Sequence, residues 1–208
     1  MPELPEVETI RRQLSEEVVG QTVIRAGSHE SEKFSPARKA QGRCFIELGR
    51  RGKYLIGEFD NETELIIHLG MTGQLLIDTE EEASKKLDPY CRAWWLLANG
   101  KTVVYRDVRR FGRIAIVNKG DYSKIPTLRD MGPEPFSVEL TGDEVWSRSK
   151  GRRSRIKTQL LSQRLIAGVG NIYADEALFL ARINPALRSI SRSQAERLLD
   201  CVRTVLSE

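Results

Sequence analysis

The segment IKTQLLSQRLIAGVGNIYADEALFLARI, residues 156–183, is the most informative part of the sequence for the architecture. Apolar residues recur at helical spacing on both sides of the break AGVGN at 167–171, which indicates two helices joined by a tight turn. Gly168 and Gly170 allow the backbone to approach a ligand closely, and Asn171 is expected to cap the second helix. A helix N-terminus of this kind favours a bound phosphate, although an ordinary helical hairpin is the alternative.

Helical patterns extend outward from this segment in both directions. The stripe before the break consists of Ile156, Leu160, Leu161 and Leu165. A final helix is predicted to begin at a capping box formed by Ser191 and Gln194. Its apolar face consists of Leu198, Val202, Val205 and Leu206. The pattern of this helix continues to the last residue, so the chain is expected to be cut short there.

A separate helix is predicted at the N-terminus. Its apolar stripe consists of Val7, Ile10, Leu14 and Val18. Pro5 suits the first turn, and Gly20 lies where a C-cap glycine is common. The residues that precede this helix are therefore expected to be anchored rather than loose.

Strand patterns dominate from about residue 21 to 130. Alternating apolar residues and glycine-containing turns occur in RCFIELGRRGKYLIGEF (43–59), TELIIHLGMTGQLLI (63–77) and KTVVYRDVRRFGRIAIV (101–117). Several short strands separated by turns predict an antiparallel sandwich. The charged stretch DTEEEASKKLDPY (78–90) is predicted to be a mobile loop.

The two patterns together predict an α+β protein with two domains. The N-terminal antiparallel β-sandwich and its leading helix would occupy residues 1–132, and the helical domain would occupy residues 143–208. The stretch MGPEPFSVELTG (131–142) holds two prolines and two glycines, which predicts a linker at 133–142.

Composition and charge exclude several classes of protein. The 208 residues contain no apolar run long enough to cross a membrane, and the acidic, proline-rich N-terminus does not resemble a secretory signal, so a cytoplasmic protein is expected. The cysteines and histidines are too few and too dispersed for a zinc site, and disulfides are not expected. The net charge of +4 includes three basic clusters, at 50–53, 106–113 and 148–164, which favour phosphate binding over ordinary solvated faces.

The N-terminal residues Met1, Pro2 and Glu3 can carry chemistry. Removal of the initiator methionine, which is normal before proline, would give Pro2 a free secondary amine. With a reference pKa near 8, about a tenth of such amines are unprotonated at neutral pH. An attack on C1′ of a damaged nucleotide would give an iminium ion that acts as an electron sink, and Glu3 is placed to transfer a proton. Taken alone, however, these residues fit a simple helix start better.

Five motifs in sequence order resemble the formamidopyrimidine-DNA glycosylase and endonuclease VIII family. They are MPELPEVET (1–9), LGRRGKYL (48–55), HLGMTG (68–73), DVRRFG (107–112) and AGVGNIYADE (167–176). The first and last are highly specific, and the first points to the formamidopyrimidine branch. The resemblance covers essentially the whole chain.

The resemblance implies a role for each matching position. Pro2 would be the Schiff-base nucleophile, Glu3 the acid and base, and Lys53 a phosphate contact and proton donor in β-elimination. Met71, Arg109 and Phe111 would fill the gap left by an extruded base, where an apolar wedge and a hydrogen-bonding arginine are suited. Without the resemblance, Lys53 fits a solvated strand lysine, and Met71 and Phe111 fit core residues.

The family's helix–two-turns–helix would place further residues on DNA. The matching positions are Asn171, Arg152 and Lys157. Several arginines surround the last two, so the family's basic positions can be aligned with this stretch in more than one register. The resemblance thus implies a bifunctional base-excision repair glycosylase and AP lyase for 8-oxoguanine and formamidopyrimidines. Its partner would be double-stranded DNA with damaged bases or abasic sites, bound in the basic cleft between the two domains. The protein would be a monomer of the bacterial type and would associate with the nucleoid.

The chain departs from the family pattern at three places. Residues for the family's usual zinc finger are absent from the chain, so no cofactor is expected, and δ-elimination and affinity are open. In PYCRAWW (89–95), Tyr90 stands where members commonly have histidine, and Val108 replaces a common proline. The alternative from another class is a module that binds damaged or abasic DNA without cutting it, and a generic RNA-binding protein is a third possibility.

Overall fold

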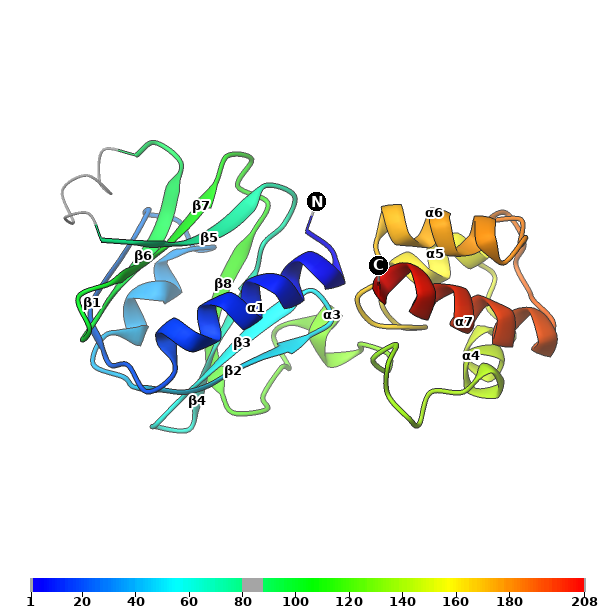
Figure 1. Ribbon diagram of the computed structural model, residues 1–208, viewed down its shortest axis with the longest axis horizontal. Coiled ribbons are helices and arrows are strands. Elements are labelled where there is room, and N and C mark those ends of the chain that lie inside the picture. The colour runs from blue at the N-terminus through cyan, green and yellow to red at the C-terminus, as the bar shows by residue number, and fades with distance from the viewer. Residues whose placement is uncertain (1, 80–87, 208) are drawn as a thin grey trace. The chain divides into compact units, whose positions relative to one another are not determined.

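The structure, a computed structural model, describes residues 2–79 and 88–207 (Figure 1). The loop predicted at 78–90 lies mostly outside the described residues. In chain order the elements are α1 (Leu4–Val18), β1 (Val23–Ser28), the 3-10 helix η1 (Ser35–Ala40), β2 (Phe45–Arg51), β3 (Tyr54–Phe59), β4 (Thr63–His68), β5 (Gly73–Asp78), β6 (Cys91–Leu97), β7 (Thr102–Asp107), β8 (Arg113–Asn118), α3 (Pro126–Arg129), α4 (Gly142–Ser149), α5 (Ile156–Leu161), α6 (Asn171–Leu180) and α7 (Arg192–Ser207).

The described strands form two antiparallel four-stranded sheets. One has the order β1-β6-β7-β5, and the other has the order β2-β3-β4-β8. Strand positions alternate between buried and partly exposed most clearly in β3, as expected where one sheet face covers a core. The predicted α+β fold with an N-terminal sandwich and a C-terminal helical region is confirmed.

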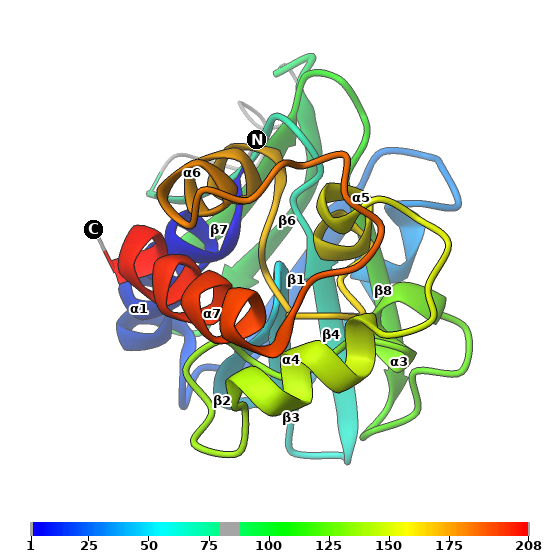
Figure 2. The same ribbon diagram turned by 90° about the vertical axis from the view of Figure 1, so that its right-hand side faces the viewer.

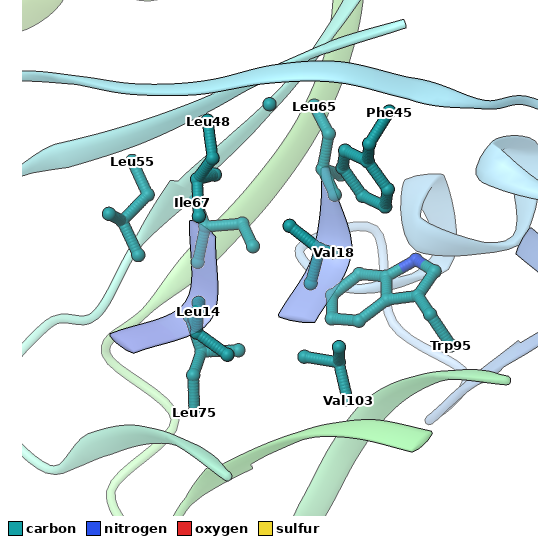
Figure 3. Close-up of a pocket in the computed structure, with 11 residues that line it drawn as sticks. Leu14, Val18, Phe45, Leu48, Leu55, Leu65, Ile67, Leu75, Trp95 and Val103 are labelled. Carbon is teal, nitrogen blue, oxygen red and sulfur yellow. The ribbon is translucent and has the colours of Figure 1, made fainter. Parts of the chain in front are cut away.

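The apolar core of the sandwich receives side chains from both sheets and from α1. Leu14 and Val18 of α1 point into the same space as Val103 and Phe45, which come from different sheets (Figure 3). An apolar cavity of about 20 Å³ remains between them. The predicted stripe of α1 is therefore confirmed as its buried face, and Gly20, with φ +79°, follows the helix in the left-handed conformation expected of a C-cap glycine.

The 3-10 helix η1, which the sequence patterns did not predict, connects the two sheets. It contacts β1 and β6 of one sheet and β8 of the other. The buried indole Nε1 of Trp95 in β6 donates a hydrogen bond of 3.1 Å to the carbonyl oxygen of Ala37 in η1. This bond satisfies the polar atom of a large core side chain and fixes η1 against the sheet.

Backbone contacts divide the chain into two compact units. The β unit contains Met1–Pro2 and Glu6–Tyr122, and the helical unit contains Glu3–Pro5 and Ser123–Glu208. The division therefore precedes the expected linker at 133–142. Part of that segment packs within the helical unit, because Leu140 is buried in its core and Ala167 N donates to Pro133 O at 2.9 Å.

In the helical unit, α7 packs against α4 and α6 (Figure 2). The predicted capping box is confirmed, since Gln194 N donates to Ser191 Oγ at 3.2 Å and Ser191 N donates to Gln194 Oε1 at 2.9 Å. The predicted apolar face of α7 is buried throughout. The units thus have separate cores, one built from strands and α1 and the other from helices.

Helix α5 is shorter than its apolar stripe suggested. It ends at Leu161, which is 39% exposed, and Gln163 two residues later has φ +63°. A left-handed residue cannot continue an α-helix, so the chain turns there, and Leu165 reaches the core from the turn rather than from the helix. Among the described residues, no helix combines the length and the apolar character that crossing a membrane requires.

Candidate active site

Strand register gathers three turns of the β unit at one end of a sheet. Tyr54 of β3 pairs with His68 of β4, and His68 pairs with Arg113 of β8. The connections that adjoin these paired residues are 52–53, 69–72 and 108–112. They contain the sequence-predicted residues Lys53, Met71, Arg109 and Phe111, which are thereby brought to one end of the sandwich.

A buried carboxylate joins the two longer connections. Asp107, which is fully buried, accepts hydrogen bonds from Thr72 Oγ1 at 2.6 Å and from Gly112 N at 2.8 Å. Thr72 Oγ1 in turn accepts a bond of 3.1 Å from Arg109 N. Both connections carry the chain from one sheet to the other, and Asp107 fixes each relative to the other. Burial and the neighbouring Asp107 raise the pKa of the Tyr105 hydroxyl, which keeps that group protonated beside the carboxylate.

The three predicted gap-filling residues lie on these connections with their side chains exposed. Met71 is 40% exposed and Phe111 is 52% exposed, so neither is a core residue. The guanidinium carbon of Arg109 lies 4.7 Å from the centre of the Phe111 ring. Gly70 brings the two backbones together, because a Cβ at this position would lie 2.5 Å from Gly112 N. The two connections thus present an apolar side chain, an aromatic ring and a cation at one end of the sandwich.

Lys53 occupies the two-residue turn between β2 and β3 and is only 8% exposed. The interpretation of Lys53 as a fully solvated strand lysine is therefore wrong. The pKa of the neighbouring His68 falls to about 4. Burial is the main cause, and the positive charges of Lys53 and Arg113 lower the pKa further. Lys53 and His68 are therefore neighbouring ionisable groups at this end of the sheet.

His68 is a candidate that the sequence reasoning did not single out. Its Nδ1 accepts a hydrogen bond of 3.2 Å from Gly70 N, which assigns the hydrogen of the neutral ring to Nε2. The ring also lies 4.7 Å from that of Tyr54. Only its position at the start of HLGMTG distinguishes it in the sequence, because a half-buried histidine at a strand end has no pattern of its own.

In the helical unit, the N-terminal end of α6 binds the carboxylate of Glu3. Glu3 is 1% exposed, and its Oε1 and Oε2 accept hydrogen bonds from Ile172 N at 3.0 Å and Tyr173 N at 3.5 Å. The amide groups and the dipole of a helix N-terminus favour a negative charge there. A residue from the start of the chain is thus held by a helix about 170 positions later.

The prediction that Asn171 caps α6 is wrong. The N-cap residue is Gly170, with φ −108° and ψ −160° and no side-chain hydrogen bond, and Asn171 is the first helical residue. An asparagine inside the helix cannot accept from the amides of the first turn as an N-cap does, and the Glu3 carboxylate takes that place. Asn171 itself is exposed.

Gly168 permits a close approach, and the group that approaches it is Leu4. A Cβ on Gly168 would lie 2.3 Å from a methyl carbon of Leu4, and the φ of +80° also favours glycine. Leu4 is 3% exposed and belongs to the core of the helical unit. Glu3 and Leu4 are therefore both fixed, and Pro2, which precedes them, is half-buried.

The remaining basic positions are engaged within the helical unit. Lys157 Nζ donates to Asp175 Oδ2 at 2.8 Å, which holds the start of α5 beside the first turns of α6. Arg152 Nε donates to Arg148 O at 2.6 Å near the end of α4. Lys157 and Asn171 thus belong to one neighbourhood, whereas Arg152 is tied to a different helix.

Tyr90, which stands where the resembled family commonly has histidine, lies at the surface. It is 41% exposed, and the Arg106 guanidinium lies 6.0 Å from the centre of its ring. Arg106 also donates to Asp88 at 2.6 Å. Burial by itself would raise the pKa of Asp88, but the bonds from Arg106 and from Tyr90 N lower it. Val108 is exposed as well.

The described residues do not fit a zinc site. Within 2–79 and 88–207, no three histidine, cysteine or acidic side chains are grouped as metal ligands. Cys44, Cys91 and Cys201 form no disulfide bond in the described part of the chain.

Comparison with known proteins gives concordant matches along the whole chain. The family model for the formamidopyrimidine-DNA glycosylase N-terminal domain matches residues 1–114, and the model for the formamidopyrimidine-DNA glycosylase H2TH domain matches residues 131–208. Formamidopyrimidine-DNA glycosylase of Thermus thermophilus is 42% identical over 210 residues, covering 100% of this chain and 75% of the relative. That of Thermomicrobium roseum is 43% identical over 229 residues, covering 100% and 78%.

Solved structures of similar proteins have the same fold. The crystal structure of the MutM (Fpg) protein from Thermus thermophilus matches with a TM-score of 0.89 and 42% identity, covering 99% of this chain and 75% of that one. The Lactococcus lactis formamidopyrimidine-DNA glycosylase, bound non-covalently to DNA containing an AP site, matches with a TM-score of 0.87 and 31% identity, covering 99% and 80%.

Proposed function

Because the chain belongs to the formamidopyrimidine-DNA glycosylase family of base-excision repair, we propose that it removes oxidised purines from DNA and cleaves the strand with its N-terminal proline as nucleophile. The substrates are 8-oxoguanine and formamidopyrimidines in double-stranded DNA. The observation that supports this proposal best is the binding of the Glu3 carboxylate at the N-terminus of α6. It holds the residue next to Pro2 in a defined place.

The proposed reaction begins with the unprotonated amine of Pro2, after removal of Met1. The nitrogen forms a bond to C1′ and loses its proton, the bond from C1′ to the base breaks, and the departing base takes up a proton. The sugar ring then opens: the bond from C1′ to O4′ breaks, O4′ takes up a proton, and C1′ and the nitrogen are joined as an iminium ion. The resulting iminium ion increases the acidity of the C2′ hydrogens. Loss of one of them expels the 3′ phosphate by β-elimination, and hydrolysis of the iminium releases the protein.

Glu3 and Lys53 are the proposed proton-transfer groups. Glu3 would serve the sugar and the departing base while α6 fixes its carboxylate. Lys53, buried in its turn, would contact a phosphate and donate a proton during elimination. No cofactor is needed for these steps.

DNA binding is proposed to use both units. Met71 and Phe111 would fill the space left by the extruded base, and Arg109 would hydrogen-bond the orphaned partner base. Asn171, Lys157 and Arg152 would contact the phosphate backbone. We expect the protein to bind duplex DNA as a monomer, which light scattering of the complex would test. We also expect it to associate with the bacterial nucleoid in the cytoplasm.

Borohydride trapping on a duplex with one abasic site tests the nucleophile. The wild-type chain is expected to form a covalent adduct, and intact mass is expected to show that Met1 has been removed. The double variant Pro2→Gly, Glu3→Gln should lose the adduct. Pro5→Gly alters a proline in the same segment and should retain it.

The alternatives predict different results. Tight binding to abasic DNA without an adduct would support a non-catalytic damage-binding module. Equal affinity for abasic and intact duplex would support a generic RNA-binding protein. Retention of Met1, or an adduct that persists in the double variant, would contradict the proposed mechanism.

A further inference from the structure

The turn between α5 and α6 contains a buried side chain that lies outside the five family motifs. Gln163 is 7% exposed and adopts φ +63°, a conformation that glutamine rarely takes. Holding a non-glycine residue there costs free energy, which other contacts must compensate. The hydrogen bonds of its side chain are contacts of this kind.

The carboxamide of Gln163 binds the backbone of the glycine-containing turn at two adjacent residues. Its Nε2 donates to Val169 O at 2.6 Å, and its Oε1 accepts from Gly168 N at 2.8 Å. The backbone carbonyl of Gln163 also accepts from Gly132 N at 2.8 Å. Gln163 therefore fixes the turn from one side while it is itself tied to the chain before α4.

The two residues that Gln163 binds, Gly168 and Val169, are connected to residues 3 and 4 by direct packing and through helix α6. Gly168 packs against Leu4. Val169 is followed by Gly170 and then by α6, whose Ile172 N binds Glu3. A shift of the turn would move both surfaces that hold residues 3 and 4.

We propose that Gln163 is a positioning residue for the N-terminal nucleophile. It acts through the 168–170 turn, which sets the positions of Leu4 and Glu3 and thereby of Pro2. This inference rests on the proposed function, because it assigns Gln163 a part in the reaction of Pro2. It does not place Gln163 in contact with DNA.

Gln159 provides a matched control. It is also a buried glutamine of the helical unit, 1% exposed, and its Nε2 donates to two backbone carbonyls, Ser154 O at 2.9 Å and Arg188 O at 3.2 Å. Those carbonyls lie outside the 168–170 turn. Gln163→Leu and Gln159→Leu therefore each remove a buried carboxamide, and only the first releases the turn.

The first measurement separates binding from reaction. At saturating abasic duplex, Gln163→Leu is expected to slow single-turnover formation of the borohydride-trapped adduct by about 10- to 100-fold, because small misplacements of a reacting group have effects of this size. Its Kd for the same duplex should stay within about twofold of the wild-type value, since the phosphate contacts remain. Gln159→Leu should leave both quantities nearly unchanged at a temperature where thermal unfolding shows both variants to be folded.

The second measurement does not depend on activity. Hydrogen exchange of the Ile172 and Tyr173 amides, which bind Glu3, should be faster in Gln163→Leu and unchanged in Gln159→Leu. Unchanged exchange in Gln163→Leu, or faster exchange with a normal rate of adduct formation, would overturn the inference. If the wild type forms no adduct, the proposed function fails, and the exchange experiment still decides whether Gln163 holds Glu3.

Should Gln163→Leu fail to fold, Gln163→Glu takes its place. The carboxylate keeps the acceptor for Gly168 N and loses the donor to Val169 O. We expect a smaller loss of rate and faster exchange at the same two amides. A normal rate together with normal exchange would again overturn the inference.

Discussion

The two units hold their candidate site residues by different means. In the β unit, antiparallel register brings three turns together, and the side chain of Asp107 joins two of them. In the helical unit, backbone amides at the start of α6 hold a side chain from the other end of the sequence. The first arrangement depends on the buried carboxylate of Asp107. The second depends on the backbone of the 168–170 turn, whose conformation Gly168 and Gln163 determine.

This difference predicts where each arrangement is vulnerable. Loss of one side chain should loosen the connections of the β unit, because several donors share one acceptor. In the helical unit, the backbone amides survive most substitutions, so damage should come from changes in the turn that leads to α6. Substitutions in each unit test this contrast.

The largest effect is expected from Asp107→Ala. This change leaves the partners of Asp107, the partly buried Thr72 Oγ1 and the buried Gly112 N among them, without their acceptor, and should lower the free energy of unfolding by about 4 kcal/mol. Urea unfolding measures the difference. Asp88→Ala removes a carboxylate paired with Arg106 nearer the surface and should cost about 1 kcal/mol or less. Equal losses would show that Asp107 does not organise the connections.

Gly168→Ala tests the turn of the helical unit. A new methyl group meets Leu4 at 2.3 Å in a residue with φ +80°, and the expected loss is about 3 kcal/mol. Gly151→Ala is the matched control, because its φ of +75° imposes the same strain with nothing within 4 Å. That variant should lose about 1 kcal/mol, and thermal unfolding of both variants measures the difference. Similar values for both would mean that the contact with Leu4 is soft.

The pH dependence of stability tests His68. Its pKa is about 4 in the folded protein against an ordinary value of 6.5, so the unfolded chain binds the proton more readily. The stability contributed by the neutral ring is complete above pH 6.5 and is lost as the pH falls from 6.5 towards 4. Carboxylates also titrate at the lower end of this range. We therefore expect wild type to lose about 2 kcal/mol more than His68→Gln between these pH values, measured by urea unfolding. Parallel curves would contradict burial of the ring.

The smallest effect is expected at α7. Ser191→Ala removes the side-chain acceptor of Gln194 N and should cost about 1 kcal/mol, seen as a lower Tm. Thr141→Ala removes the equivalent bond to Glu144 N at the start of α4 and should cost a similar amount. Because neither cap touches the 168–170 turn, trapping of the abasic-site adduct should be unaffected. A large loss of trapping in either variant would show that the helical unit does not separate stability from positioning.

Local patterns predicted the features that depend on neighbours in sequence. The stripe of α1, the C-cap glycine and the capping box at Ser191 each follow from residues a few positions apart, and all three were confirmed. Strand alternation predicted the sandwich. The resemblance identified the candidate residues, but the patterns alone favoured solvated or core positions for Lys53, Met71 and Phe111.

Long-range contacts could not be predicted in this way. Glu3 and Ile172 are separated by 169 positions, so nothing near Asn171 indicated that a carboxylate from elsewhere occupies the cap of α6. Asp107 is similarly a single acidic residue at a strand end. Gln163 lies inside an apparently continuous helical stripe, and only its positive φ shows where the helix stops.

The separation between Glu3 and its helix also bears on how the protein is made. A chain is synthesised from its N-terminus, and domains generally fold as they emerge from the ribosome. The β unit can form once about residue 122 has emerged, whereas residues 3–5 pack with partners that are translated much later. The first residues to leave the ribosome are thus among the last to reach their native environment, and a nascent chain with a folded sandwich still lacks a seated N-terminus.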